Sequence, residues 1–76
     1  MKEFEIYILE WILKVTGKNI SNTDDVFVIG ALDSLNFAEL IASIEDNFDI
    51  ILDFTDLLDW NSLKTTQGIS AFIMKQ

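Results

Sequence analysis

An aspartate and a serine stand together at Asp33-Ser34, where a loop gives way to an amphipathic helix. The hydrophobic spacing predicts this helix over residues 34–48, so Ser34 falls in its first turn. Free backbone amides and the positive end of the helix dipole tolerate an anionic phosphodiester on a hydroxyl at such a place. A serine at a helix start is also a common N-cap, and Asp33 could cap equally well. Taken alone, the residue types favour a simple cap at Ser34, and only the surrounding motif can indicate a further role for its hydroxyl.

Three residue types that carry much of protein catalysis are missing from the chain, which has no cysteine, histidine or arginine. Their absence removes disulfides and protein thiolates, the commonest general base and metal ligand, and the usual bidentate clamp for phosphate. We therefore expect neither a self-sufficient hydrolase nor a metalloenzyme. With 76 residues, half of them hydrophobic, the chain is predicted to form one packed domain over residues 1–76.

The chain is strongly acidic, with a net charge of −8. This charge argues against nucleic acid and membrane surfaces as partners. Because no stretch resembles a signal peptide or a membrane span, we expect a cytoplasmic protein. No basic residue occurs between Lys18 and Lys64, a stretch that favours basic protein partners unless it is only a solvated face. Its carboxylates lack the loop spacing and the glycine turn of a calcium site. Within it, eight acidic residues occur from position 33 to position 59: Asp33, Glu39, Glu45, Asp46, Asp49, Asp53, Asp56 and Asp59.

Hydrophobic spacing divides the first two thirds of the chain into helix, loop and helix. The first helix is predicted over residues 3–15, with Gly17 as its stop. Residues 18–33 lack a sustained period, so we expect a long loop pinned by Phe27. The helix over residues 34–48 is the clearest element. Its predicted buried stripe consists of Leu40, Ile41, Ile44 and Phe48.

The last third of the chain is predicted to add a short helix and a longer one. Residues 50–63 carry enough apolar side chains for one short helix or a pair of turns. Ser62 or Thr65 can then cap a final helix, in which Gly68 lowers stability by up to about 1 kcal/mol relative to alanine. The inward residues of that helix are Ile69, Phe72 and Ile73. The predicted fold is all-α: a small bundle of three longer helices and one short helix.

The pattern around the serine resembles the phosphopantetheine attachment site of acyl, aminoacyl and peptidyl carrier proteins. These proteins show a glycine, two or three further residues, Asp-Ser-Leu, and then a helix that ends in a Glu-rich turn and a phenylalanine. The length of the chain, its acidity and the loop before the serine agree with the resemblance. The matching positions are Gly30, Asp33, Ser34, Leu35, Glu39, Leu40, Glu45 and Phe48.

The resemblance implies an acyl-carrier-protein-like fold and a covalent cofactor. A phosphopantetheinyl transferase would deliver 4′-phosphopantetheine from coenzyme A to Ser34, and Asp33 would help to hold the transferase's magnesium. The thiol of the arm would carry an acyl or aminoacyl intermediate as a thioester, from an activating ligase to downstream synthases or transferases. The carrier would be a non-catalytic monomer that binds basic partner surfaces weakly. Its implied docking face consists of Leu35, Glu39, Glu45 and Asp46.

Departures from the fatty-acid-synthesis pattern favour a discrete, free-standing carrier similar to D-alanyl and aminoacyl carriers. Gly30 lies four residues before the serine, whereas fatty-acid carriers usually have the glycine three residues before it. Ala38 and Ala42 stand where those carriers often show valine and methionine, and Phe37 replaces a small polar residue.

The segment over residues 53–63 resembles the aromatic-containing third-helix region of aminoacyl-type carriers, and we expect Trp60 to lie in the core. Because that core is crowded, the cargo is expected to stay mostly outside the bundle. The cargo could be fatty acyl, aminoacyl, polyketide or peptidyl, and the sequence does not choose among them. The alternative function is a small acidic adaptor or inhibitor that binds basic proteins without a cofactor, in which Ser34 would be only a cap.

Overall fold

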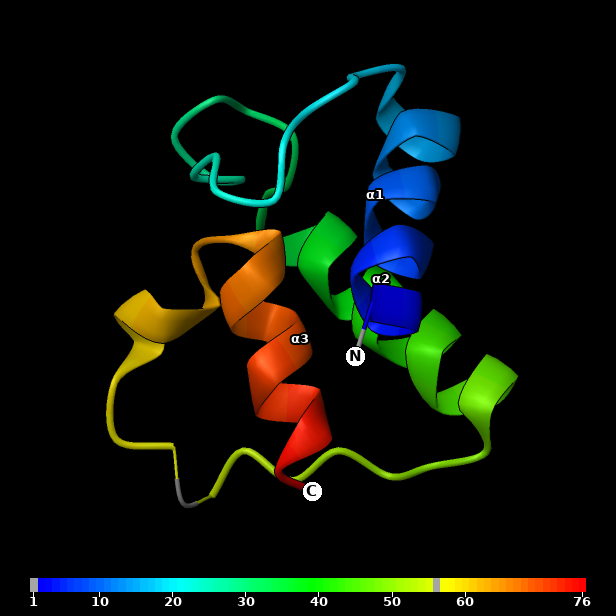
Figure 1. The fold of residues 1–76 in the computed structure, drawn as a ribbon, viewed down its shortest axis with the longest axis vertical. Coiled ribbons are helices and arrows are strands. Elements are labelled where there is room, and N and C mark those ends of the chain that lie inside the picture. The colour runs from blue at the N-terminus through cyan, green and yellow to red at the C-terminus, as the bar shows by residue number, and fades with distance from the viewer. Residues whose placement is uncertain (1, 56) are drawn as a thin grey trace.

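The computed structural model describes residues 2–55 and 57–76, and its regular structure is entirely helical (Figure 1). The elements are α1 (Lys2–Thr16), α2 (Ser34–Phe48), the 3₁₀ helix η1 (Trp60–Leu63) and α3 (Thr66–Met74). The predicted all-α class and its three longer helices are confirmed. The fourth predicted helix is a single 3₁₀ turn, and no strand occurs in the described residues. Asp56, one of the eight acidic residues, lies outside them.

Local signals set both ends of α1. Glu3 and Glu5 lie in its first turn and Lys14 in its last, where each charge complements the helix dipole. Gly17 follows the helix with a φ of +77°, and its amide donates to the carbonyl of Leu13 over 2.9 Å. A left-handed residue after the last turn ends a helix and favours glycine, so the predicted stop is confirmed.

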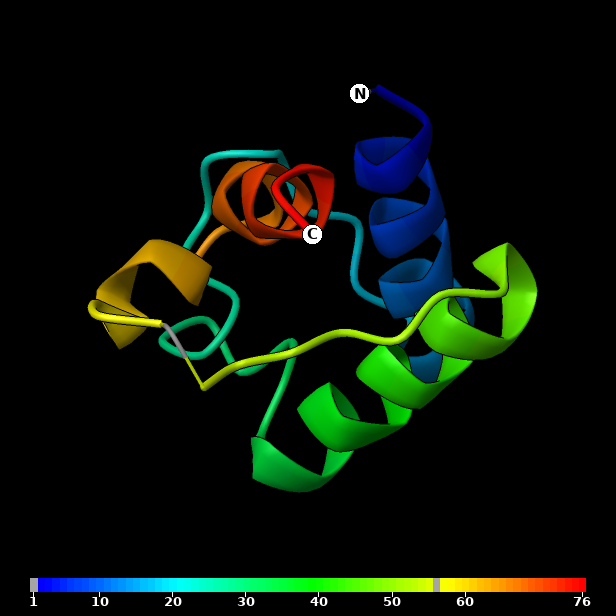
Figure 2. The same cartoon turned by 90° about the horizontal axis from the view of Figure 1, so that it is seen from below.

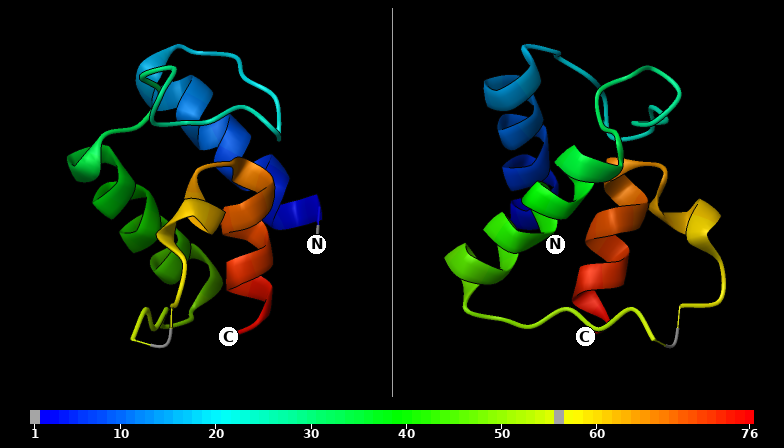
Figure 3. Two further views of the ribbon diagram at one scale, coloured as in Figure 1. Left: turned by 90° about the vertical axis from the view of Figure 1, so that its left-hand side faces the viewer. Right: turned by 180° about the vertical axis from the view of Figure 1, so that it is seen from behind.

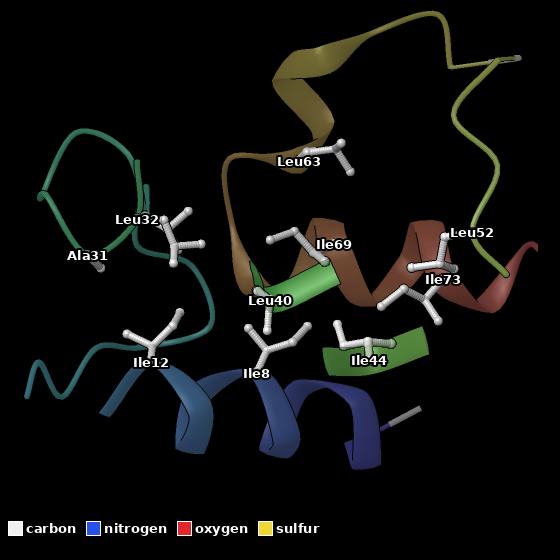
Figure 4. Packing of buried hydrophobic residues seen from close by; sticks show 11 residues of the cluster. Ile8, Ile12, Ala31, Leu32, Leu40, Ile44, Leu52, Leu63, Ile69 and Ile73 are labelled. Carbon is white, nitrogen blue, oxygen red and sulfur yellow. The ribbon is translucent and has the colours of Figure 1, made fainter. Parts of the chain in front are cut away.

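The core lies between the three α-helices (Figure 4). Ile8 of α1 lies beside Leu40 and Ile44 of α2, and Ile12 points toward Leu32 of the loop before α2. Burial of one such aliphatic side chain contributes roughly 1.5–3 kcal/mol to stability. The predicted inner faces of α2 and α3 are confirmed only in part, because some of their members are half-buried. The half-buried members are Ile41, Phe48 and Phe72.

Val26, rather than Phe27, anchors the long loop between α1 and α2. Val26 is fully buried, whereas Phe27 is 38% exposed, so the prediction for Phe27 was wrong. The Val26 amide donates to the Lys64 carbonyl over 2.7 Å, and the Leu32 amide donates to the Val26 carbonyl over 2.9 Å. These bonds turn Val26 inward and leave the Phe27 ring on the surface, where it contacts Phe37 at a centroid distance of 5.8 Å.

An irregular segment that we call the strap, residues 49–55 and 57–59, connects α2 to η1 (Figures 2 and 3). Leu52 is buried, and the Phe54 ring stacks on Phe72 of α3 with centroids 4.8 Å apart. The strap carries the chain to Trp60, whose ring stacks on Phe54 at 5.9 Å. Trp60 is nevertheless 61% exposed, so its predicted place in the core was wrong.

Gly68 lies where η1 meets α3. A Cβ atom at this position would stand 1.8 Å from the carbonyl oxygen of Ser62. The glycine therefore permits a close approach of two backbones, in addition to its predicted cost in helix propensity. The cap of α3 is Thr65, whose hydroxyl accepts the Gly68 amide over 3.0 Å.

Candidate functional site

Asp33 and Ser34 divide between them the two roles that the sequence left open. The Asp33 Oδ1 atom accepts the Asn36 amide over 2.8 Å, and the Asp33 carbonyl accepts the Phe37 amide, so Asp33 is the N-cap of α2. Ser34 is the first residue of the helix and is exposed. Among the described residues, no hydrogen-bond partner holds its hydroxyl. The hydroxyl is free for chemistry because the capping is done by its neighbour.

Hydrogen bonds, a glycine turn and buried side chains determine the path of the loop before the serine, and so the position of Ser34. The Asp25 Oδ1 atom accepts the amides of both Phe27 and Val28 at 3.0 Å. Gly30 then reverses the chain with a φ of +78°, a conformation that side chains other than glycine rarely adopt. Ala31 and Leu32 are buried immediately afterwards. Burial of Leu32 fixes the chain just before Asp33, and the Asp33-Ser34 pair is exposed at the N-terminus of α2.

The positive end of α2 suits an anionic group on Ser34. Asp33 accepts the amides of Asn36 and Phe37. The backbone amides of Ser34 and Leu35 have no acceptor among the described residues. Unpaired amides at a helix start attract phosphate oxygens. Asp33 has one carboxylate oxygen in the cap and a second one without a partner among the described residues, which could bind a cation brought by another protein. The described residues contain no cluster of three or more metal-binding side chains.

Three of the four predicted docking residues share one exposed stripe of α2. Leu35, Glu39 and Asp46 recur with Ala42 at helical spacing and are all exposed, Leu35 to 66%. The fourth, Glu45, is placed elsewhere. It is half-buried, and its Oε2 atom accepts the amide of Leu52 over 2.8 Å. The structure thus brings three of these side chains together and engages the fourth in holding the strap.

An apolar surface groove lies beside the serine, between α2, the strap and η1. Positions 34, 38, 41 and 45 fall on one face of α2, so the groove begins one turn below Ser34 on the same face. The sequence did not predict this groove. Phe54 and Trp60 line it only because the irregular strap brings them beside α2. The lining residues are Phe37, Ala38, Ile41, Ala42, Glu45, Phe54 and Trp60.

Comparison with known proteins identifies the class of this site. The chain matches the family described as the phosphopantetheine attachment site over residues 7–66. A search of curated proteins and a search of solved structures each returned no significant match. Because the match covers most of the chain, the protein belongs to the phosphopantetheine-dependent carrier proteins.

This membership defines the chemistry that the site supports. Domains of this family carry covalent 4′-phosphopantetheine, are generally non-catalytic, and interact with a phosphopantetheinyl transferase and with partner enzymes. The free hydroxyl and the open helix end described above fit such a group. No helix in the described part of the chain is both long and apolar enough to cross a membrane.

Proposed function

We propose that this protein carries an acyl or aminoacyl intermediate as a thioester on a phosphopantetheine arm attached to Ser34, and moves it between biosynthetic enzymes. The observation that carries the proposal is the exposed, unbonded hydroxyl of Ser34 at the start of α2, beside a carboxylate that caps the helix. A transferase can reach this hydroxyl without breaking any hydrogen bond that the described residues make.

The attachment step uses two residues of this chain. The Ser34 oxygen forms a bond to the phosphorus next to pantetheine in coenzyme A. The bond to the bridging pyrophosphate oxygen breaks, adenosine 3′,5′-bisphosphate leaves, and a base of the transferase takes the serine proton. We assign Asp33 to support the transferase's magnesium with the oxygen that does not cap α2. The thiol of the arm then supplies the thioester chemistry that the protein, which lacks cysteine, does not have.

Partner enzymes would dock on the exposed stripe of α2, with Leu35 as its apolar contact and Glu39 and Asp46 as its charges. Net charge −8 supports basic partner surfaces and fast, salt-dependent encounters. Exposed charge pairs are individually weak, so each partner is released quickly, as a shuttle requires. Glu45 is not assigned to this face, because it lies off the stripe and its carboxylate holds the Leu52 amide.

Intact-mass measurement tests the attachment directly. Wild-type protein and a Ser34→Ala control are incubated with coenzyme A, magnesium and a broad-specificity phosphopantetheinyl transferase. We expect one phosphopantetheine on the wild type and none on the control. Because Asp33 rather than Ser34 caps α2, the control should unfold at the same denaturant concentration as the wild type. A folded wild type that gains no mass would refute the proposal and favour the acidic adaptor.

A further inference from the structure

The groove beside Ser34 lies within reach of anything tethered to that residue. It follows the face of α2 that carries Ser34 and extends from Phe37 to Glu45. At 1.5 Å of rise per residue, its far end is about 16 Å along the helix from Ser34. An extended phosphopantetheine arm is comparable in length, so an arm folded back along α2 would bring its thioester to the groove. The tether therefore makes the cargo the natural occupant.

Aromatic rings form the walls of the groove. Phe37 and Phe54 meet edge to face with centroids 6.4 Å apart, and Phe54 stacks nearly parallel to Trp60, with 7° between the ring planes. Trp60 stays 61% exposed although it stacks on Phe54. This open indole surface is available to a further ring.

The α2 side of the groove combines small and large side chains, and the groove is small. Ala38 and Ala42 stand four residues apart and project only methyl groups, while Phe37 and Ile41 of the same helix also line the space. The volume is about 340 Å³, near the lower end for small-molecule sites. One or two rings fit such a space, whereas a long alkyl chain would extend past Trp60 into solvent.

The electrostatics of the groove disfavour an anionic cargo. Among the described residues, Glu45 is the one charged residue in the lining, and its carboxylate remains acceptor-only after one oxygen has bound the Leu52 amide. A carboxylate on the cargo would meet a like charge beside apolar rings. A neutral apolar group would meet ring faces and two methyl groups.

We propose that this groove receives a planar aromatic acyl group carried on the arm, and thereby favours aryl over saturated cargo of the same size. The inference rests on the proposed function, since it requires the arm on Ser34. Aryl cargo is favoured because ring pairs attract one another beyond the burial of their area, and because the groove already presents the rings of Phe37, Phe54 and Trp60. A saturated ring is thicker and has no π face to stack on Trp60.

Two matched cargoes test the proposal. The same transferase loads Ser34 from benzoyl-coenzyme A or from cyclohexanecarbonyl-coenzyme A, and intact mass confirms each product. NMR then follows the methyl signals of Ala38 and Ala42 and the indole N–H signal of Trp60. Because an aromatic ring shifts nearby signals more than a saturated ring does at equal occupancy, occupancy is read from the nuclear Overhauser contacts between cargo protons and the two methyl groups. We expect these contacts to be about threefold stronger with benzoyl than with saturated cargo.

Two substitutions separate the groove from its surroundings. Trp60→Ala removes one wall and should reduce the contacts of the benzoyl ring with the Ala38 and Ala42 methyl groups to the level of the saturated cargo. Leu58→Ala is the matched control, because Leu58 lies in the strap two residues before Trp60, is 98% exposed and does not line the groove. It should leave the contacts between the benzoyl ring and the two methyl groups unchanged.

The possible outcomes distinguish this inference from the function on which it rests. Loading without contacts between the cargo and the Ala38 and Ala42 methyl groups, or equal contacts with both cargoes, would overturn the aryl groove and leave the carrier function intact. Failure of a folded protein to accept either cargo would overturn both.

Discussion

The Oε2 atom of Glu45 accepts the backbone amide of Leu52 over 2.8 Å, which joins the last turns of α2 to the beginning of the strap. The carbonyl of Glu45 also accepts the amides of Asp49 and Ile50. Glu45 thus holds the strap through both its side chain and its backbone, and it does so at the edge of the groove.

Replacing Glu45 with alanine should destabilise the protein. Leu52 is buried, so loss of the carboxylate leaves its amide without an acceptor, which costs about 1–3 kcal/mol of unfolding free energy. Glu45→Gln keeps an oxygen in place and should lose less. Urea denaturation measures both, with Glu39→Ala on the exposed stripe as the control. Equal effects of Glu45→Ala and Glu39→Ala would show that the bond does not contribute.

Gly68→Ala should destabilise the protein even though alanine is the better helix former. The added Cβ would stand 1.8 Å from the Ser62 carbonyl oxygen, so η1 and α3 must move apart. We expect a net loss of about 1–3 kcal/mol, typical of overpacking. Thermal or urea unfolding measures it beside Gln67→Ala, which changes the exposed neighbouring position. A Gly68→Ala protein as stable as the wild type would contradict the close approach of the two backbones.

Two substitutions at Asp33 separate its cap from its proposed role with magnesium. Asp33→Ala removes the acceptor for Asn36 and should cost about 1 kcal/mol of stability. Asp33→Asn keeps a capping oxygen but removes the negative charge, so stability should hold while the rate of phosphopantetheine transfer to Ser34 falls. Unfolding curves and time-resolved intact mass give the two readouts. An unchanged transfer rate in Asp33→Asn would eliminate the magnesium role and leave the cap.

The pKa of Asp53 should respond to Thr55. The Thr55 hydroxyl, and after it the Thr55 amide, donate hydrogen bonds to the Asp53 carboxylate and hold its pKa below the ordinary 3.8. Since the folded pKa is the lower one, the resulting stabilisation is present above the unfolded pKa and is lost as the pH falls through the folded pKa. Thr55→Val should raise the pKa of Asp53 in a carboxyl NMR titration, whereas Thr55→Ser, which keeps the hydroxyl, should leave it low.

The parts of the fold that depend on near neighbours could be predicted from the sequence. The bounds of α2 follow from the periodicity of residues 34–48 and from a cap that reaches only three residues ahead, and Gly17 ends α1 through its own backbone preference. The positions that failed depend on distant contacts. Val26 is turned inward by the carbonyl of Lys64, and Trp60 is held at the surface by a strap that sequence alone could have made helical.

The same dependence explains the candidate site. The serine proposed as the attachment site could be located in the sequence because its motif is continuous there. The groove was not, because its walls come from α2, the strap and η1, and because the role of Glu45 requires an amide seven residues later in a segment without periodicity. The spacing of Glu45 suited a docking face, and no sequence signal marked its bond to Leu52.

Two backbone amides at the middle of the strap donate to side chains of other elements. The Leu52 amide donates to the Glu45 carboxylate, and the Asp53 amide donates to the Gln76 side-chain oxygen over 3.0 Å. Because these hydrogen bonds are not part of a helix, the strap can open as a unit while the three α-helices stay packed. In hydrogen exchange, the amides of Leu52 and Asp53 should then share one opening free energy, smaller than that of global unfolding. The wall of the groove would belong to a separate, less stable cooperative unit, which could part from α2 and close again without the protein unfolding.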